Sequence, residues 1–98
     1  MIVETELVET KKGAAFGIKV KLGKAPLILV RADNGYLVCG YFDRKVVDKL
    51  RDCCAIVPGV KSFGDMKRKK VAYASKAAQK LGIKKGMPGE RALDKLIT

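Results

Sequence analysis

The chain has 98 residues, of which 48% are hydrophobic, and a formal net charge of +11 from 21 Lys plus Arg against 10 Asp plus Glu. This length predicts a single domain over residues 1–98, and the hydrophobic content excludes a disordered chain. No apolar run approaches the ~20 residues of a membrane span, and the early acids of M-I-V-E-T-E-L do not fit a secretory signal. We therefore expect a cytoplasmic protein with no membrane partner, whose positive charge favours an anionic one.

Two N-terminal strands are expected, over Ile2–Thr10 and Ala15–Leu22, with a turn at Lys11–Gly13 between them. In the second strand apolar residues alternate with Lys19 and Lys21, which is typical of a half-buried strand. We expect its apolar face to pack on the core; this face consists of Phe16, Ile18, Val20 and Leu22.

A central hairpin follows over Ala25–Asp43, with Asn34-Gly35 at its turn. Both residues tolerate the positive φ of a type I′ turn, and a two-residue loop there sets Asp33 opposite Tyr36. Because side chains alternate along a strand, one face carries Ile28, Val30, Ala32, Leu37, Cys39 and Tyr41, and the other carries Leu27, Leu29, Arg31, Tyr36, Val38, Gly40 and Phe42. Both faces are mostly apolar, so we expect both to be covered.

Three helices and one short strand are expected after the hairpin. Asp43 is a natural N-cap for a first helix with an apolar stripe of Val46, Val47, Leu50, Cys53 and Cys54. A strand over Ala55–Val57 and a linker over Val60–Asp65 precede a second helix, Val71–Leu81, which ends at Gly82. The last helix turns Ala92, Leu93 and Leu96 inward.

These elements predict an α+β (mixed α/β) fold. We expect a single sheet of four to five strands built on the central antiparallel hairpin, with three helices packed mainly on one face. Three short helices do not cover both faces of such a sheet. A partner subunit would then cover the second apolar face of the hairpin, so the sequence predicts a homo-oligomer.

The three cysteines are Cys39, Cys53 and Cys54, and there is no histidine. Three thiols do not make a disulfide framework, and structural zinc takes four Cys or His ligands, so we expect no metal site and no cofactor. A single Asn and a single Gln with abundant lysine are typical of thermophilic proteins. A thermophilic source would explain part of the positive charge without a nucleic acid.

The densest charge cluster, the basic run, consists of Lys67, Arg68, Lys69 and Lys70. We expect it at the start of the second helix, whose exposed side also carries Lys76 and Lys80. Cations at a helix N-terminus oppose the helix dipole, so helix stability does not explain them, whereas free amides there attract anions. These six residues are candidates for an anion or nucleic-acid site. A solvated basic loop is the alternative.

A second candidate site on the hairpin comprises Tyr36, Cys39, Gly40 and Asp43. Gly40 within a strand indicates a bend or a close approach by a ligand. Cys39 is either a buried structural thiol or a nucleophile, and without histidine no Cys–His pair can form within the chain. Asp43 is either the helix cap or a catalytic carboxylate. The sequence leaves open whether the protein is an enzyme.

Short motifs between residues 15 and 96 share their order and spacing with a known family. They are Asn34-Gly35-Tyr36-Leu37-Val38-Cys39-Gly40, Asp43, Gly59-Val60, Leu81-Gly82-Ile83, and Gly86-Met87 followed by Gly89 and Ala92-Leu93. In these motifs the chain resembles the YunC-like family, a domain of unknown function in bacteria and archaea. The resemblance implies a compact α/β domain and supplies no catalytic residues. The family motif positions that could form a site are Cys39, Gly40 and Asp43.

From the sequence we favour a non-catalytic domain that binds an anionic ligand in a homo-oligomer. One alternative is a nucleic-acid-binding module that uses the basic run. The other is an enzyme with a pocket around Cys39, Gly40 and Asp43.

Overall fold

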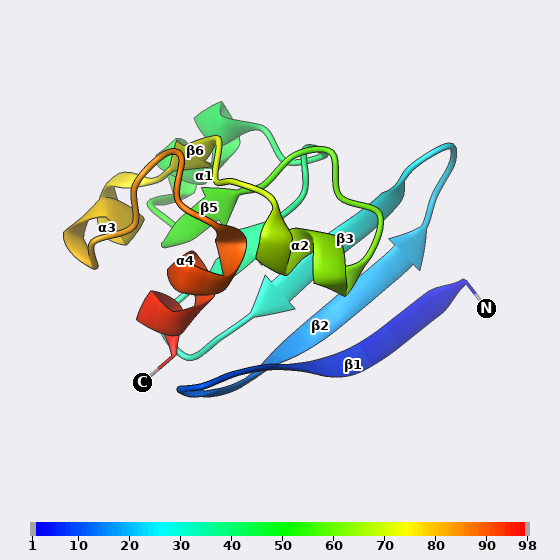
Figure 1. Ribbon diagram of the computed structural model, residues 1–98. Helices are drawn as coiled ribbons and strands as arrows, with labels where there is room; N and C mark the ends of the chain where they lie inside the picture. The colour runs from blue at the N-terminus through cyan, green and yellow to red at the C-terminus, as the bar shows by residue number, and fades with distance from the viewer. Residues whose placement is uncertain (1, 98) are drawn as a thin grey trace.

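The computed structural model describes residues 2–97, which form one twisted sheet flanked by helices (Figure 1). The strands lie in the sheet in their sequence order. They are β1 (Val3–Thr10), β2 (Gly13–Lys21), β3 (Pro26–Arg31), β4 (Tyr36–Val38), β5 (Cys54–Ile56) and β6 (Tyr73–Ala74). The helices are α1 (Arg44–Leu50), α2 (Phe63–Arg68), α3 (Lys76–Lys80) and α4 (Gly89–Leu96). No helix within residues 2–97 has the length and apolar character needed to cross a bilayer.

The sheet has one parallel pair, β4 with β5, in which Tyr36 lies opposite Cys54; its other pairs are antiparallel. Parallel neighbours need a crossover connection, and α1 lies in that connection. We call the sheet face that packs against α2 and α4 the inner face. Helix α1 packs on the opposite, outer face, over β4 and β5 (Figure 1).

The α+β class is confirmed, but the described residues form six strands and four helices, where four to five strands and three helices were expected. The expected linker contains the start of α2, because Ser62 caps that helix by accepting the Asp65 amide at 3.1 Å. The helix expected over 71–81 is divided: Ser75 caps α3, and the residues before it pair with β5 as β6. Elements this short show too little periodicity to be recognised.

The hairpin has the expected faces but not the expected register. Arg31 lies opposite Tyr36, where Asp33 was expected. The two-residue loop is Asp33-Asn34, one position earlier than expected, because the Ala32 amide donates to the Gly35 carbonyl at 2.8 Å. A shift by two residues leaves every side chain on its original face, which is why the predicted division of apolar residues survives.

Gly35 serves close packing and not a type I′ turn, since neither it nor Asn34 has a positive φ. A Cβ on Gly35 would lie 2.3 Å from the Cys53 carbonyl oxygen and 2.9 Å from a methyl group of Leu96. The Asn34 amide donates to the Leu96 carbonyl at 2.9 Å. The end of α4 therefore packs directly against the hairpin turn.

Strand β2 contributes its small residues, Ala15 and Gly17, to the inner core. Phe63 of α2 lies over Gly17, where a Cβ would come within 2.7 Å of the ring. The expectation that the large apolar residues of β2 pack on the core is therefore wrong. Phe16 is 48% exposed on the outer face, Leu22 is exposed as well, and the side chains between them are only partly buried.

A smaller core lies under α1 and consists of Val38, Val47, Cys54 and Ile56. Asp43 caps α1 as expected, accepting the Lys45 amide at 2.8 Å. The expected five-residue stripe of this helix is wrong, because Arg51 takes a left-handed conformation (φ 59°) and ends it before the two cysteines. Only Val47 of α1 is buried.

We expect Gly35→Ala to lower the free energy of unfolding by about 2–3 kcal/mol, because the added methyl group overlaps the Cys53 carbonyl and Leu96. Gly23→Ala is the matched control: nothing lies within 4 Å of its Cβ position, so its effect should stay within about 1 kcal/mol. Urea denaturation measures both. Equal stabilities of the two variants would contradict the close approach at Gly35.

We also expect stability to fall at alkaline pH. Burial and the neighbouring Asp52 carboxylate raise the pKa of the Cys54 thiol from its ordinary value of 9.0 to about 12. The folded state holds this proton more tightly than the unfolded state, so the contribution is complete below pH 9.0 and is lost as pH rises toward about 12. Urea midpoints across this window should decline less steeply in Cys54→Ala; an identical slope would contradict the assignment.

Candidate functional site

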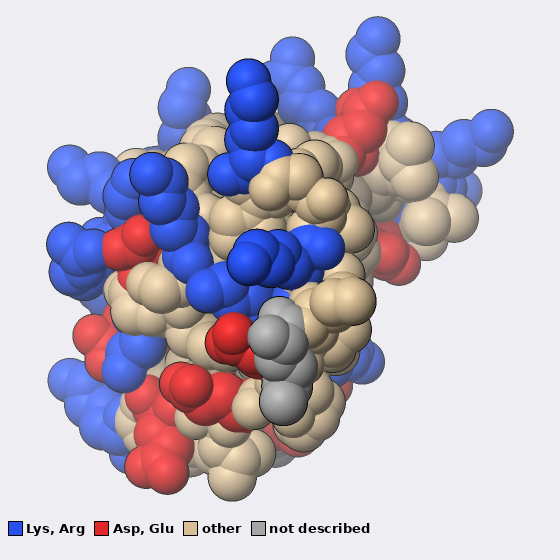
Figure 2. Space-filling view, turned by 90° about the vertical axis from the view of Figure 1, so that its right-hand side faces the viewer, with Lys and Arg blue, Asp and Glu red and all other residues tan. Residues whose placement is uncertain are grey.

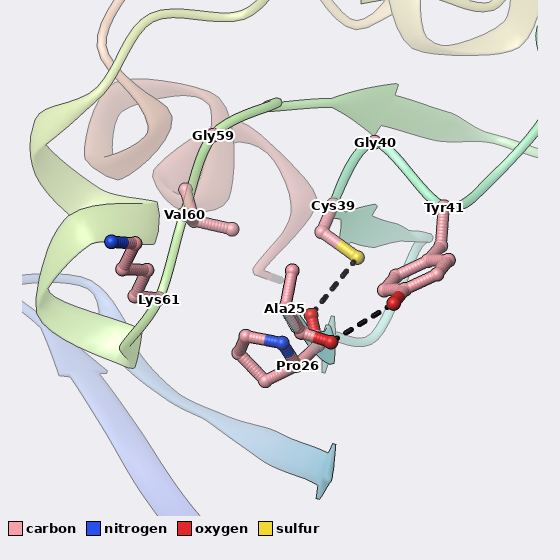
Figure 3. Close-up of a pocket in the computed structure, with 8 residues that line it drawn as sticks. All are labelled: Ala25, Pro26, Cys39, Gly40, Tyr41, Gly59, Val60 and Lys61. Atoms are coloured by element: carbon pink, nitrogen blue, oxygen red, sulfur yellow. Dashed lines mark hydrogen bonds between the residues drawn. The ribbon is translucent and has the colours of Figure 1, made fainter. Parts of the chain in front are cut away.

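A pocket opens at the edge of the sheet where the parallel strands β4 and β5 end. The carboxyl ends of such strands are the usual place for ligands in open α/β sheets. This carboxyl-end pocket has a volume of about 300 Å³ and is lined by Ala25, Pro26, Cys39, Gly40, Tyr41, Gly59, Val60 and Lys61 (Figure 3). Three segments thus meet: the entry to β3, the exit from β4 and the loop after β5.

Backbone contacts hold the polar groups of Cys39 and Tyr41 in place. The Cys39 thiol accepts the Ile28 amide at 3.3 Å and donates to the Pro26 carbonyl at 3.9 Å. The Tyr41 hydroxyl donates to the Ala25 carbonyl at 2.9 Å. Both side chains point toward the entry to β3 (Figure 3). They make a fixed wall whose hydrogen-bonding capacity is largely used.

The opposite wall is the loop that carries Gly59 and Lys61, and α2 anchors it. The Lys69 ammonium donates to the Gly59 carbonyl at 2.6 Å. The Lys61 amide donates to a carboxylate oxygen of Asp65 at 3.1 Å, and this bond, with help from Arg68, lowers the pKa of Asp65. The Lys61 side chain is turned away from the Cys39 thiol (Figure 3). The backbone of Lys61 is therefore fixed, while its ammonium faces away from the apolar wall.

A second depression, which we call the lysine depression, adjoins the first. It has a volume of about 290 Å³ and is lined by Ile2, Glu4, Lys19, Lys21, Gly23, Lys24, Pro26 and Lys61. Pro26 and Lys61 line both spaces. Figure 2 shows the side of the molecule that carries the β2–β3 loop, where basic side chains spread over the upper and middle parts and acidic ones gather mainly below. An apolar pocket thus continues into a cationic one.

The structure brings together two of the four hairpin candidates, Cys39 and Gly40. Tyr36 lies on the α1 side of the sheet, where its hydroxyl donates to Asp52. Burial and this hydrogen bond raise the pKa of Tyr36. Asp43 is exposed, and its carboxylate caps α1. A direct Cys39–Asp43 pair is therefore not formed in this geometry.

The basic run lies at the end of a helix and not at the start of one, because α2 covers Phe63–Arg68. Cations in a last turn favour the helix dipole, so the argument that helix stability does not explain them is wrong. Lys67 donates to the Glu9 carbonyl at 3.0 Å and lies 3.7 Å from Glu90, and Arg68 pairs with Asp65. Lys69 donates to the Gly59 carbonyl. Three members of the basic run, Lys67, Arg68 and Lys69, are therefore held by contacts within the protein.

The remaining basic candidates lie elsewhere. Lys76 and Lys80 belong to α3 and line another depression, together with the acidic side chains of Asp48 and Asp52. Lys70 is exposed and its backbone forms an isolated bridge to Pro88. The six basic candidates therefore do not all belong to the helix start for which they were proposed.

Sequence reasoning missed most of the pocket: Ala25, Pro26, Tyr41, Gly59, Val60 and Lys61. One signal was available, since Pro58-Gly59 directly follows a short predicted strand and marks the loop at its carboxyl end. The meeting of this loop with residues 25–26 depends on the order of strands in the sheet, which no local pattern records.

Comparisons with known proteins place the chain among relatives of unknown function. The family described as "Domain of unknown function (DUF1805)" matches residues 38–96. The uncharacterized protein YunC of Bacillus subtilis (strain 168) is 32% identical over 84 residues, which cover 82% of this chain and 83% of that protein. The crystal structure of TA1206, a protein of unknown function from Thermoplasma acidophilum, superposes with a TM-score of 0.90 at 35% identity and covers 96% of this chain and 92% of that one. The chain therefore belongs to the YunC-like family, the domain of unknown function DUF1805.

Proposed function

We propose that this protein is a non-catalytic domain that binds a small anionic ligand with an apolar part, and that it works as a homo-oligomer. One observation carries the proposal: the apolar carboxyl-end pocket and the lysine depression share Pro26 and Lys61. A ligand seated across this junction would bury its apolar part between Cys39, Tyr41 and Val60. Its anionic group would lie toward the lysines.

The charge of the lysine depression supports an anion. Its lining includes four ammonium groups, those of Lys19, Lys21, Lys24 and Lys61, against one carboxylate, that of Glu4. The ion pairs found among the described residues, Lys67–Glu90 and Arg68–Asp65, include none of these four lysines. Lysine carries its charge on a flexible four-carbon stem, so the Lys61 ammonium can swing toward either space.

The size of the carboxyl-end pocket supports a small ligand. Its volume of about 300 Å³ lies at the lower end of the range for small-molecule sites. A single ring or a short chain fits such a space. Hydrophobic lining with a few charged groups at one side is also the usual composition of a ligand site.

A binding role is favoured over catalysis because the reactive groups of the pocket are already engaged. Cys39 and Tyr41 hydrogen-bond to backbone groups. The chain has no histidine, and none of the described residues that line the carboxyl-end pocket carries a carboxylate. Activation of Cys39 would need a base within hydrogen-bonding distance, and Asp43 is used as a helix cap.

The lysine depression is also favoured over the basic run as the anion site. Lys67, Arg68 and Lys69 already contact carbonyl or carboxylate oxygens, so binding a nucleic-acid backbone there would first break these contacts. The nucleic-acid module therefore ranks below the small-ligand site.

We expect phenyl phosphate, an anion on an apolar ring, to raise the thermal midpoint more than inorganic phosphate or phenol at equal concentration. Binding stabilises the folded state by mass action, and only phenyl phosphate fills both spaces. Lys61→Glu should weaken its binding by about tenfold or more, because a charge-assisted contact becomes a repulsion. Thermal melts at increasing probe concentration measure this.

Lys84→Glu is the matched control for Lys61→Glu, since Lys84 is an exposed lysine that lines a different depression. Its binding should stay close to that of the wild type. An equal loss of phenyl phosphate binding in both variants would mean that the lower net charge of the protein, and not the site, causes the loss. The same small response to all three probes would contradict the site.

We expect thiol reagents to modify Cys53 first in the folded protein. Cys53 is half-buried, whereas Cys39 and Cys54 are 3% and 1% exposed. Burial raises the pKa of Cys53, so its reaction should speed up in the alkaline range, where the thiolate forms. Labelling followed by peptide mass spectrometry measures the order. Rapid labelling of Cys39 at neutral pH would instead support the enzyme alternative.

A further inference from the structure

Half of the outer face of the sheet is apolar, and the described residues 2–97 leave it uncovered. The strand register places Leu7 beside Phe16 and Ile18 beside Leu29 on this face. Leu7 is 63% and Phe16 48% exposed. We call the outer face of β1–β3 the floor. Its apolar side chains are those of Val3, Leu7, Phe16, Ile18, Val20 and Leu29.

Helix α1 stands on the other half of the same face and presents a second apolar surface toward the floor. Val47 packs on the sheet, and Asp48 faces β6, because its carboxylate accepts the Tyr73 hydroxyl at 2.6 Å. At about 100° per residue, Val46 and Leu50 lie on the opposite flank of α1, toward β3. They are 53% and 64% exposed.

The floor is nearly free of charge in a chain whose net charge is +11. By register, its only charged strand residues are Glu9 and Arg31, which have opposite signs, while Lys19 and Lys21 point to the inner face. Two copies of such a cationic chain repel each other over most of their surfaces. The floor is where a second copy can approach without that repulsion.

We propose that the outer face is the interface between two copies of this chain, with α1 of each copy seated on the floor of the other. A two-fold axis places α1 of one copy over the floor of its partner and the partner's α1 over the floor of the first copy. The same surface is then used by both copies, as an isologous interface requires. Val46 and Leu50 then contact the partner's Leu7 and Phe16. This assigns a surface to the homo-oligomer proposed above and does not depend on anion binding.

The area suits a dimer. Eight strand residues with a rise of about 3.3 Å, and three strands about 4.8 Å apart, give the floor roughly 25 Å by 15 Å. Helix α1 has seven residues, so it is about 10 Å long and about 10 Å wide and extends this to roughly 480 Å² per copy in projection. Two copies would bury roughly 960 Å² in projection, close to the ~1,000 Å² expected of a specific interface. An extended apolar patch of this kind on a monomer also marks an interaction site.

Sedimentation velocity over micromolar concentrations tests the proposal. We expect a particle of twice the 10.7 kDa chain mass. Phe16→Lys on the floor and Val46→Glu on α1 should each raise the dimer Kd by about 30-fold or more, as loss of a central anchor does. Both residues are about half exposed, so the variants should keep the wild-type circular dichroism. Leu81→Glu, at the exposed apolar residue directly after α3, is the matched control and should remain dimeric.

The double variant Phe16→Lys, Val46→Glu distinguishes this arrangement from floor packed on floor. In the proposed dimer each new lysine faces the partner's new glutamate, so the double variant should dimerise more tightly than either single variant. No recovery would overturn the arrangement, and a dimer unaffected by the single variants would overturn the surface. A monomeric wild type would overturn the dimer itself, while the phenyl phosphate melts still report separately on the anion site.

Discussion

The parallel pairing of β4 with β5 is the constraint on which the rest of the structure depends. Because parallel neighbours cannot be joined by a tight turn, the chain crosses the outer face as α1 and covers only half of it. The same pairing sets the carboxyl ends of two adjacent strands at one edge, where their loops diverge and leave the pocket. The candidate ligand site and the uncovered floor therefore have one structural cause.

The fold was predictable where a local sequence pattern is typical of one structure only. Asp43 caps α1 and Gly82 has the positive φ of a helix end. The division of the hairpin into two apolar faces holds as well, because a slip of two residues does not change the side on which a residue lies. The prediction of a type I′ turn at Gly35 was wrong because a glycine is used either for a positive φ or for close packing. A local sequence pattern is the same in both cases.

Tertiary contacts decided the remaining features. The large apolar residues of β2 point away from the inner core because Phe63 of α2 occupies the space over Gly17. The first residues of α2 lie in the segment expected to be a linker. In the candidate site, Cys39 and Gly40 were found from the strand that carries them. Lys61 and the other lysines of the lysine depression were not predicted as site residues. Only the strand order brings residues 25–26 beside residues 59–61. The basic run attracted attention by its density, yet most of its members contact the protein's own oxygens.

The central claim is that an anion binds where the carboxyl-end pocket meets the lysine depression, and amide NMR spectra of the wild-type protein test it most directly. On titration with phenyl phosphate, the account predicts saturable shifts at Gly40, Tyr41, Gly59 and Lys61, which line the pocket, with amides of the basic run little changed. Shifts centred on residues 67–70, or no saturable shifts at all, would contradict it.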